Sequence, residues 1–235
     1  MGEPVPEQDL RPQVYREERG AQEFVRFHER AKTRGADWIY SFARVILTPI
    51  VVGPMRLRAI GTENVPASGP VILAPNHFSS WDHFMVACFV RRPLQFMAKS
   101  QLFSNPVITF ILTHGGAFPV RRGHADEEAF VTAHSILDRG GLVGVYAEGG
   151  RTRTGTFGEP RPGLGRLALE SGVPVVPVAI HGSLDVRGWR RGRFPRIEVR
   201  YGEPLRFDRV GTPSREEQLA TAEAIFARVR ELYGD

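Results

Sequence analysis

The chain has 235 residues, 42% of them hydrophobic and 24% charged, which suffices for the core of one domain and excludes a largely disordered protein. Its net charge of +5 favours acidic partners, among them nucleic acid, an anionic membrane surface and phosphorylated substrates. The single cysteine, Cys88, excludes a disulfide framework, and the polar N-terminus does not resemble a secretory signal, so we expect a cytosolic compartment.

A flexible tail is predicted over residues 1–20 and a helical segment over residues 21–58. Residues 38–47 combine aromatic and aliphatic side chains with flanking arginines, which is typical of a helix lying in the plane of a membrane surface. A helix that packs on the core fits the same pattern equally well. The apolar run of residues 45–55 is shorter than the ~20 residues that cross a bilayer, and Pro49 and Pro54 are expected to end or kink a helix. We therefore expect a peripheral association with the membrane.

Residues 59–235 are expected to form one α/β domain, because short apolar runs alternate there with helical patterns. The runs are rich in Val, Ile and aromatic residues, and they predict strands at residues 71–74, 94–98, 117–120, 142–146, 175–180 and 197–201. Helices are predicted from Ser80 to about Val90, from Pro106 onward, over residues 126–139 and over residues 219–232. This alternation predicts a mixed, largely parallel sheet flanked by helices.

The loop after the strand predicted at residues 71–74 carries Asn76 and His77, and Asp82 follows five residues after the histidine. On one continuous helix that spacing separates two side chains by about 140° around the axis. If the helix begins at Ser79 or Ser80, the chain folds back and the carboxylate reaches the imidazole. An aspartate bonded to one ring nitrogen leaves the other to accept a proton, so the pair is interpreted as a general base with its orienting group. A purely structural pair fits this motif equally well.

A base without a protein nucleophile suits an acyl donor that is already activated, such as a thioester. The sequence contains no G-x-S-x-G elbow, and Cys88 lies in the apolar run MVACFV. His77 and His83 have an H-x5-H spacing, but no third ligand is placed, so we expect no metal and no cofactor. The arginines are not interleaved with an aromatic nucleic-acid motif, and nucleic acid is not an expected partner.

Two loops place arginines beside glycines. Residues 115–123 (GGAFPVRRG) end in Arg121 and Arg122, and residues 143–158 carry Glu148, Gly149, Arg151 and Arg153. Backbone amides and guanidinium groups in such loops cradle a phosphate or carboxylate, although a solvated basic turn fits the first loop equally well. The second loop lacks the lysine and the spacing of a P-loop, so nucleotide hydrolysis is not expected.

Taken in order, four segments resemble the blocks of the glycerolipid acyltransferase family, whose best-known members are the 1-acylglycerol-3-phosphate acyltransferases. The N-H-x4-D block is matched by Asn76, His77 and Asp82, and the second block by Gly116, Phe118 and Arg122. The third block, usually F-P-E-G-T-R-S, is matched by residues 146–152 (YAEGGRT), and the V-P-V-x-P-V block is centred on Pro177. The resemblance covers residues 60–205. It departs from the family pattern at Arg121, where Asp or Asn is common, and at Ala147 and Gly150, where Pro and Thr are usual.

The resemblance implies that His77 is the general base, that Asp82 is its partner, and that the acceptor is bound by Arg122, Glu148, Gly149 and Arg151. The implied reaction moves a fatty acyl group from acyl-CoA or acyl-carrier protein to the hydroxyl of 1-acylglycerol-3-phosphate (lysophosphatidate). The product would be phosphatidate, made for phospholipid biosynthesis at the cytoplasmic face of the cell membrane. Three alternatives stay open: another lysophospholipid or a glycolipid acceptor, a thioesterase or lipid hydrolase, and a non-catalytic lipid-binding module. The extra charge of Arg121 suggests a more anionic or bulkier acceptor.

Overall fold

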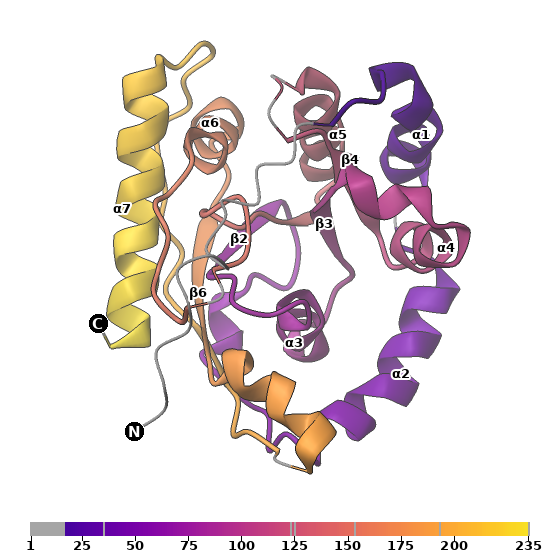
Figure 1. Cartoon of the computed structure of the whole chain (residues 1–235). Helices are drawn as coiled ribbons and strands as arrows, with labels where there is room; N and C mark the ends of the chain where they lie inside the picture. The colour runs from indigo at the N-terminus through magenta and orange to yellow at the C-terminus, as the bar shows by residue number, and fades with distance from the viewer. Residues whose placement is uncertain are drawn as a thin grey trace.

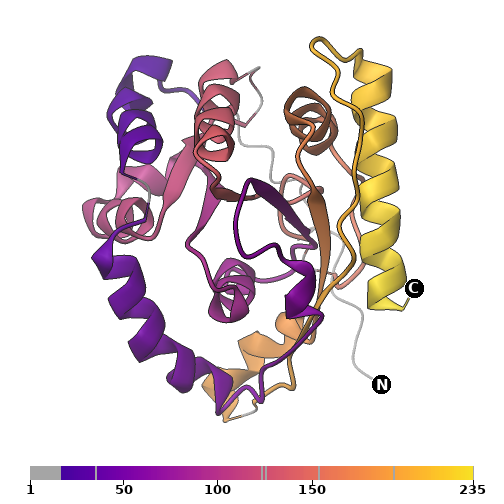
Figure 2. The ribbon, with the colours of Figure 1, turned by 180° about the vertical axis from the view of Figure 1, so that it is seen from behind.

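The computed structural model describes residues 17–234 except residues 35, 123, 125, 153 and 193, and it leaves the side chains of residues 50, 51, 187 and 189–191 undescribed. Residues 1–16 of the predicted tail and Arg153 of the Gly-rich loop therefore lie outside the described residues. The described chain is a central sheet between two layers of helices, with the C-terminal helix along one side (Figures 1 and 2).

The sheet has seven strands in the order β1-β7-β6-β2-β5-β3-β4. Their bounds are β1 (Arg58–Ile60), β2 (Val71–Pro75), β3 (Leu94–Lys99), β4 (Ala117–Val120), β5 (Leu142–Gly144), β6 (Val175–His181) and β7 (Glu198–Tyr201). The neighbouring strands β6, β2, β5, β3 and β4 are all parallel. Strand β7 pairs antiparallel with β6, and the edge strand β1 pairs parallel with β7. The predicted mixed, largely parallel sheet flanked by helices is confirmed.

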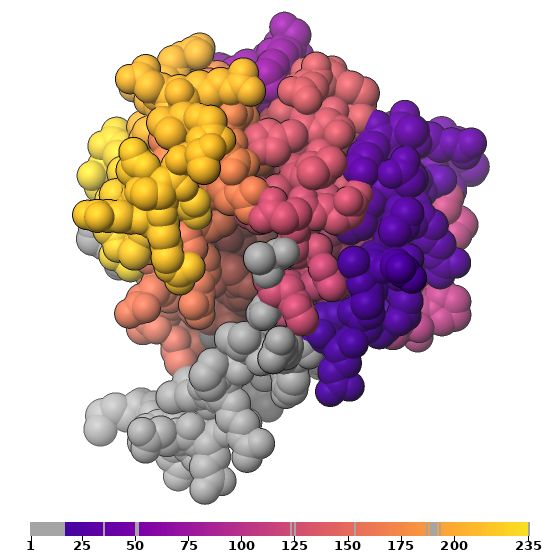
Figure 3. Space-filling view, turned by 90° about the horizontal axis from the view of Figure 1, so that it is seen from above, coloured from indigo at the N-terminus to yellow at the C-terminus, as the bar shows by residue number. Residues whose placement is uncertain are grey.

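The α-helices are α1 (Val25–Thr33), α2 (Trp38–Val52), α3 (Asp82–Phe89), α4 (Pro106–His114), α5 (Glu127–Asp138), α6 (Pro162–Ser171) and α7 (Arg215–Tyr233). Short 3-10 turns are η2 (Ala21–Phe24), η3 (Thr62–Asn64), η4 (Ser100–Ser104) and η5 (Ser183–Arg191). Seen from above, α5 lies between the indigo α1 and the yellow-orange C-terminal segment (Figure 3). On the other side of the sheet, α3 packs on the strands and α2 runs along the periphery (Figure 1).

The core has two halves because the side chains of a strand alternate between the faces of the sheet. On β2, Val71 and Leu73 pack toward α3, whereas Ile72 and Ala74 pack toward α5, α6 and α7. All four side chains are fully buried. Both faces of the parallel strands are thus covered, and only the loops at the strand ends are left to form a site.

Each predicted strand is present, but β1 and α6 were not predicted. The strand β1 is a three-residue edge strand, too short to give an alternating signal. In α6, Gly165 breaks the expected helical pattern, yet a Cβ there would lie 1.8 Å from the Gln218 carbonyl oxygen of α7. Glycine is therefore required for the close approach of the two helices.

Two helix boundaries differ from the prediction. Helix α3 begins at Asp82 rather than Ser80, because the Ser79 hydroxyl accepts the amide of Trp81 and holds the chain in a turn before the helix. Helix α2 continues through Pro49 to Val52. The proline lies in the last turn, and the carbonyl that loses its helical partner belongs to the exposed residue Val45, four positions earlier.

Candidate active site

The candidate residues gather at one edge of the sheet, where the parallel strands end. His77 follows β2, Lys99 is the last residue of β3, Arg122 follows β4, and Arg151 lies in the loop that begins after β5. These strands are consecutive neighbours in the sheet, so their carboxyl ends meet along one line. Open α/β sheets place ligands at this edge.

His77 and Asp82 are in contact, as the predicted fold-back of the chain requires. The His77 Nδ1 atom lies 3.0 Å from Asp82 Oδ2. The same carboxylate oxygen accepts the backbone amides of Phe78 at 2.8 Å and Ser79 at 2.7 Å, and Asp82 is fully buried. Asp82 therefore fixes both the orientation of the imidazole and the loop that carries it.

The surroundings of His77 favour a neutral imidazole. Burial lowers the pKa of His77 below its ordinary value of 6.5, and the hydrogen bond with Asp82 acts in the opposite direction. The ring stacks on Tyr146, with centroids 3.8 Å apart and planes at 17°. A neutral ring that donates from Nδ1 to Asp82 presents Nε2 as a proton acceptor, which is what a general base needs.

Glu148 is buried behind His77, against the backbone. Its carboxylate accepts the amide of His77 at 3.1 Å and the amide of Gly158 at 3.2 Å, while the His77 carbonyl accepts the amide of Thr152 at 3.0 Å. Burial raises the pKa of Glu148 to about 7. The resemblance groups Glu148 with the acceptor-binding residues, but these hydrogen bonds join the loop after β2 to the loop after β5.

Two arginines lie near the imidazole and affect each other electrostatically. Burial, and then the charge of Arg151, lower the pKa of Arg122, and both arginines line the same cavity as His77. Among the described residues, the Arg122 guanidinium has no hydrogen-bond or ion-pair partner. A Cβ at position 150 would lie 3.3 Å from Arg122 Nη1, so Gly150, where the family usually has Thr, leaves room for that side chain. Two neighbouring guanidinium groups have the charge and the hydrogen-bond donors that suit a phosphate or carboxylate.

Arg121 does not take part in this site. Its backbone amide donates to Asp126 Oδ2 at 2.6 Å, and its guanidinium lies 3.3 Å from Asp126 Oδ1. Its charge is paired with a buried carboxylate, and the idea that it suits a more anionic or bulkier acceptor stays a prediction.

The cavity has a volume of about 510 Å³ and joins a polar end to a long apolar groove. His77, Arg122 and Arg151 line the polar end together with Lys99. The rest is lined by side chains of α2, α3, α4 and β3, most of them aliphatic or aromatic. A charged end beside an apolar groove suits a molecule with an anionic head and a hydrocarbon tail.

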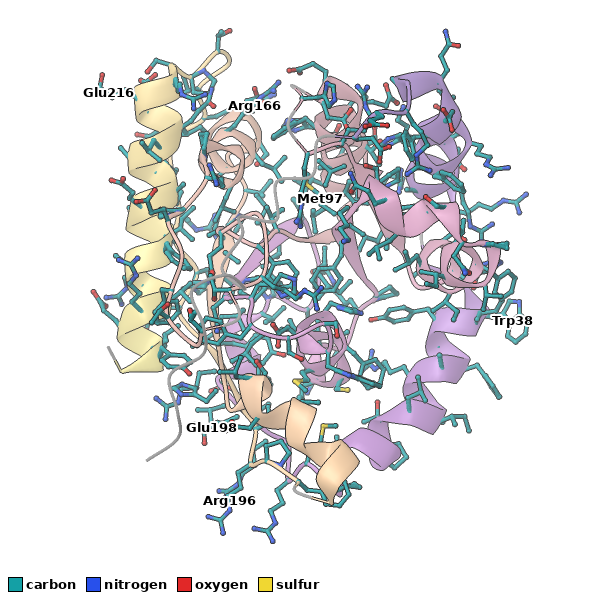
Figure 4. All side chains as sticks on the ribbon, in the orientation of Figure 1. Trp38, Met97, Arg166, Arg196, Glu198 and Glu216 are labelled. Atoms are coloured by element: carbon teal, nitrogen blue, oxygen red, sulfur yellow. The ribbon has the colours of Figure 1, made fainter. Side chains whose placement is uncertain are left out.

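Sequence reasoning missed Lys99 and the contribution of α2. Lys99 is one of two lysines in the chain and ends a strand, and these were the available signals. Helix α2 turns Tyr40, Ala43 and Leu47 toward the cavity, whereas Trp38 points outward (Figure 4). One side of this helix thus lines the cavity, and the other is exposed.

The chain is similar to known proteins in both sequence and structure. The sequence model of the family described as Acyltransferase matches residues 56–181. The 1-acyl-sn-glycerol-3-phosphate acyltransferase of Bacillus subtilis is 30% identical over 198 residues, covering 83% of this chain and 96% of the relative. A glycerol-3-phosphate acyltransferase of Pseudomonas aeruginosa is 26% identical over 187 residues, covering 62% of this chain and 22% of that protein. The fold is similar to the 1-acyl-sn-glycerophosphate (LPA) acyltransferase PlsC from Thermotoga maritima, with a TM-score of 0.56, 23% identity and 89% of each chain covered.

Proposed function

Because the chain belongs to the acyltransferase family, we propose that it moves a fatty acyl group from a thioester to the free hydroxyl of 1-acylglycerol-3-phosphate, giving phosphatidate. Family membership confirms the resemblance carried by the four sequence blocks, and the protein is an enzyme. The observation that carries the proposal is the His77–Asp82 pair at the charged end of an apolar cavity. The relatives named for this acceptor support the choice of substrate.

The residues act together in the acyl transfer. His77 Nε2 accepts the hydroxyl proton as the acceptor oxygen attacks the thioester carbon, while Asp82 stabilises the imidazolium that forms. The carbon–sulfur bond then breaks, and the imidazolium returns its proton to the thiolate. The products are an ester and a free thiol. Arg122 and Arg151 hold the acceptor phosphate, with Gly149 and the hydrogen-bonded Glu148 shaping the loop around it.

The donor is acyl-CoA or acyl-carrier protein. Both are anionic, and the net charge of +5 favours their approach. The purified protein should release thiol from a C16 acyl-CoA when lysophosphatidate is added. Thiol release that ignores the acceptor would favour a thioesterase. No release with any acceptor of a panel, and none with an acylated carrier protein as donor, would favour a non-catalytic lipid-binding module.

Arg151→Ala and Arg122→Ala should each raise the KM for lysophosphatidate by about 10- to 100-fold, with a smaller effect on kcat. Each substitution removes a charge-assisted contact to the phosphate in both the ground state and the transition state. Initial rates at varied acceptor and saturating donor measure this effect. Arg228→Ala, on the exposed face of α7, is the matched control and should leave KM unchanged. An unchanged acceptor KM in both cavity variants would refute the assignment.

We infer a peripheral association with the cytoplasmic face of the membrane through α2 and α4. Their outward sides expose Trp38, Phe42 and Val45 on α2, and Val107 and Ile111 on α4. The two helices meet where His114 lies 3.7 Å from Asp37, the residue before α2. In the part of the chain that the structure describes, every helix is too short or too polar to cross a bilayer. This exposed apolar face borders the open cavity, so a lipid can enter from the surface on which the protein rests.

Phe42→Glu combined with Ile111→Glu should reduce binding to anionic vesicles by more than about tenfold, because two large apolar side chains no longer enter the interface. Sedimentation with vesicles of phosphatidylcholine and phosphatidylglycerol measures the bound fraction. Val131→Glu combined with Leu219→Glu places the same two charges on α5 and α7, on the opposite side of the sheet, and should bind like the unmodified protein. Equal binding by all three proteins would exclude this face as the membrane contact.

A further inference from the structure

The segment that precedes the first helix is fixed to the site by a buried carboxylate. Glu17 is only 5% exposed, although it lies before the helices and outside the family match, which begins at residue 56. Its carboxylate accepts the Ser100 hydroxyl at 2.6 Å and the Arg19 guanidinium at 2.8 Å and 3.0 Å. Arg19 in turn donates to the Ser100 carbonyl at 2.8 Å. These bonds anchor Glu17 to the residue that follows Lys99 and β3.

The backbone of Glu17 contacts the loop that carries Arg122. The Glu17 amide donates to the Arg122 carbonyl at 3.4 Å, and the Glu17 carbonyl lies 2.8 Å from His124 Nε2. Since Lys99 and Val120 are partners in the register of β3 and β4, Glu17 joins the loops at the ends of two neighbouring strands. Each of those loops contributes a cation to the cavity.

Arg122 needs such support because it lies near a like charge. Arg151 disfavours the charged form of Arg122, and among the described residues no carboxylate pairs with Arg122. Without an anion in the cavity, repulsion and desolvation both favour a conformation in which the Arg122 side chain turns to solvent. Two hydrogen bonds hold the backbone here: the Arg121 amide donates to Asp126, and the Arg122 carbonyl accepts the amide of Glu17.

We propose that Glu17 is a positioning residue that holds the Arg122 loop in the geometry that binds the acceptor phosphate. This inference rests on the proposed function and names a part of its site outside the family blocks. Arg19 and Ser100 keep the carboxylate in place, and the backbone of Glu17 transmits that anchoring to Arg122. The Arg19 contact also lowers the pKa of Glu17 to about 2, so the carboxylate is ionised near neutral pH.

Glu17→Ala should raise the KM for lysophosphatidate by about tenfold and leave kcat and the donor KM within about twofold. A second readout is the ratio of kcat/KM for lysophosphatidate to kcat/KM for 1-monoacylglycerol, which lacks the phosphate. This ratio should fall in the variant, because only the phosphate contact is impaired. A residue that merely stabilised the fold would affect both acceptors equally.

The matched control is Glu198→Gln, which removes a carboxylate bonded to Arg200 on β7, at the other side of the sheet from the Arg122 loop after β4. It should leave both the acceptor KM and the ratio unchanged. The double variant Glu17→Ala/Arg122→Ala should behave like Arg122→Ala alone, because Glu17 has no side chain left to position once that of Arg122 is removed. Additive losses would show that Glu17 does not act through Arg122 and would overturn the inference.

The remaining outcomes separate this inference from the proposed function. If Arg122→Ala leaves the acceptor KM unchanged, the proposed phosphate site is wrong, and so is the positioning role of Glu17. If Arg122→Ala raises the acceptor KM but a folded Glu17→Ala does not, only the positioning role of Glu17 is wrong. If Glu17→Ala does not fold, Ser100→Ala decides, since it removes one anchor and keeps the Arg19 ion pair. It should raise the acceptor KM by about threefold, and no change there would overturn the inference.

Discussion

His77→Ala should lower kcat by about 10³-fold or more while the protein keeps its fold, because the reaction loses the group that takes the hydroxyl proton. The acceptor KM should change little, since the phosphate contacts come from other loops. Thiol release at saturating donor and acceptor measures the loss, and the thermal unfolding midpoint checks the fold. Near-normal turnover in a folded variant would refute His77 as the base.

Two other histidines make the test specific. His134 pairs with Glu170 at 2.9 Å on the outer surface of α5, so His134→Ala removes a histidine–carboxylate pair without touching the cavity. It should retain activity. His83 also lines the cavity, but it is exposed there, and Asp82 bonds to His77 instead. If His83→Ala lost as much activity as His77→Ala, the assignment of the base to the bonded histidine would be wrong.

The sheet and the His77–Asp82 contact were predictable because both depend on local signals. Each parallel strand is a short apolar run bounded by glycine or proline, and the edge strand β1 was missed because it is too short to show such a run. The contact follows from where a helix starts: Asp82 opens α3, and only a chain that turns back before the helix brings its carboxylate to His77. The spacing of the two residues and the position of the helix start together determine that Asp82 contacts His77.

The rest of the site depends on which strands become neighbours, and sequence spacing does not encode that order. Glu148 is 71 residues from His77 in the chain, but β5 pairs with β2, so the two loops meet and the carboxylate reaches the His77 amide. Glu17 reaches Ser100 across 83 residues in the same way. A polar segment at the start of the chain predicts a tail, and only tertiary structure shows that one of its carboxylates is buried.

The departures from the family pattern are also explained by the fold. Gly150 replaces the usual threonine where a Cβ would crowd Arg122, and Arg121 replaces the usual Asp or Asn with a cation that Asp126 neutralises. Both changes leave one unpaired guanidinium, that of Arg122, facing the cavity among the described residues of the loop after β4. The sequence differs from the family blocks, but a cationic position is kept beside the imidazole.

Asp82→Asn should lower kcat by about 10²-fold or more, although the substitution changes no side-chain volume. An asparagine oxygen in place of Oδ2 can still accept the amides of Phe78 and Ser79, so the loop can keep its shape. The negative charge that stabilises the imidazolium is lost, so His77 accepts the hydroxyl proton less readily. The new NH2 group would take the position of Oδ1, which is buried and without a partner among the described residues, at a cost of about 1–3 kcal/mol in stability.

The pH dependence separates charge loss from misfolding in this variant. Asp82 raises the pKa of His77 against the effect of burial, so without that charge the pKa falls further. Because the base must be neutral, activity rises with pH through this pKa, and the acid limb of the kcat profile should move to lower pH while the plateau drops. Asp37→Asn is the control, since Asp37 caps α2 by accepting the amide of Ile39 and should affect neither the limb nor the plateau. An unchanged kcat plateau in Asp82→Asn would mean that the carboxylate only supports the loop. A lower plateau with the acid limb moved to higher pH would mean that the charge of Asp82 does not act on His77.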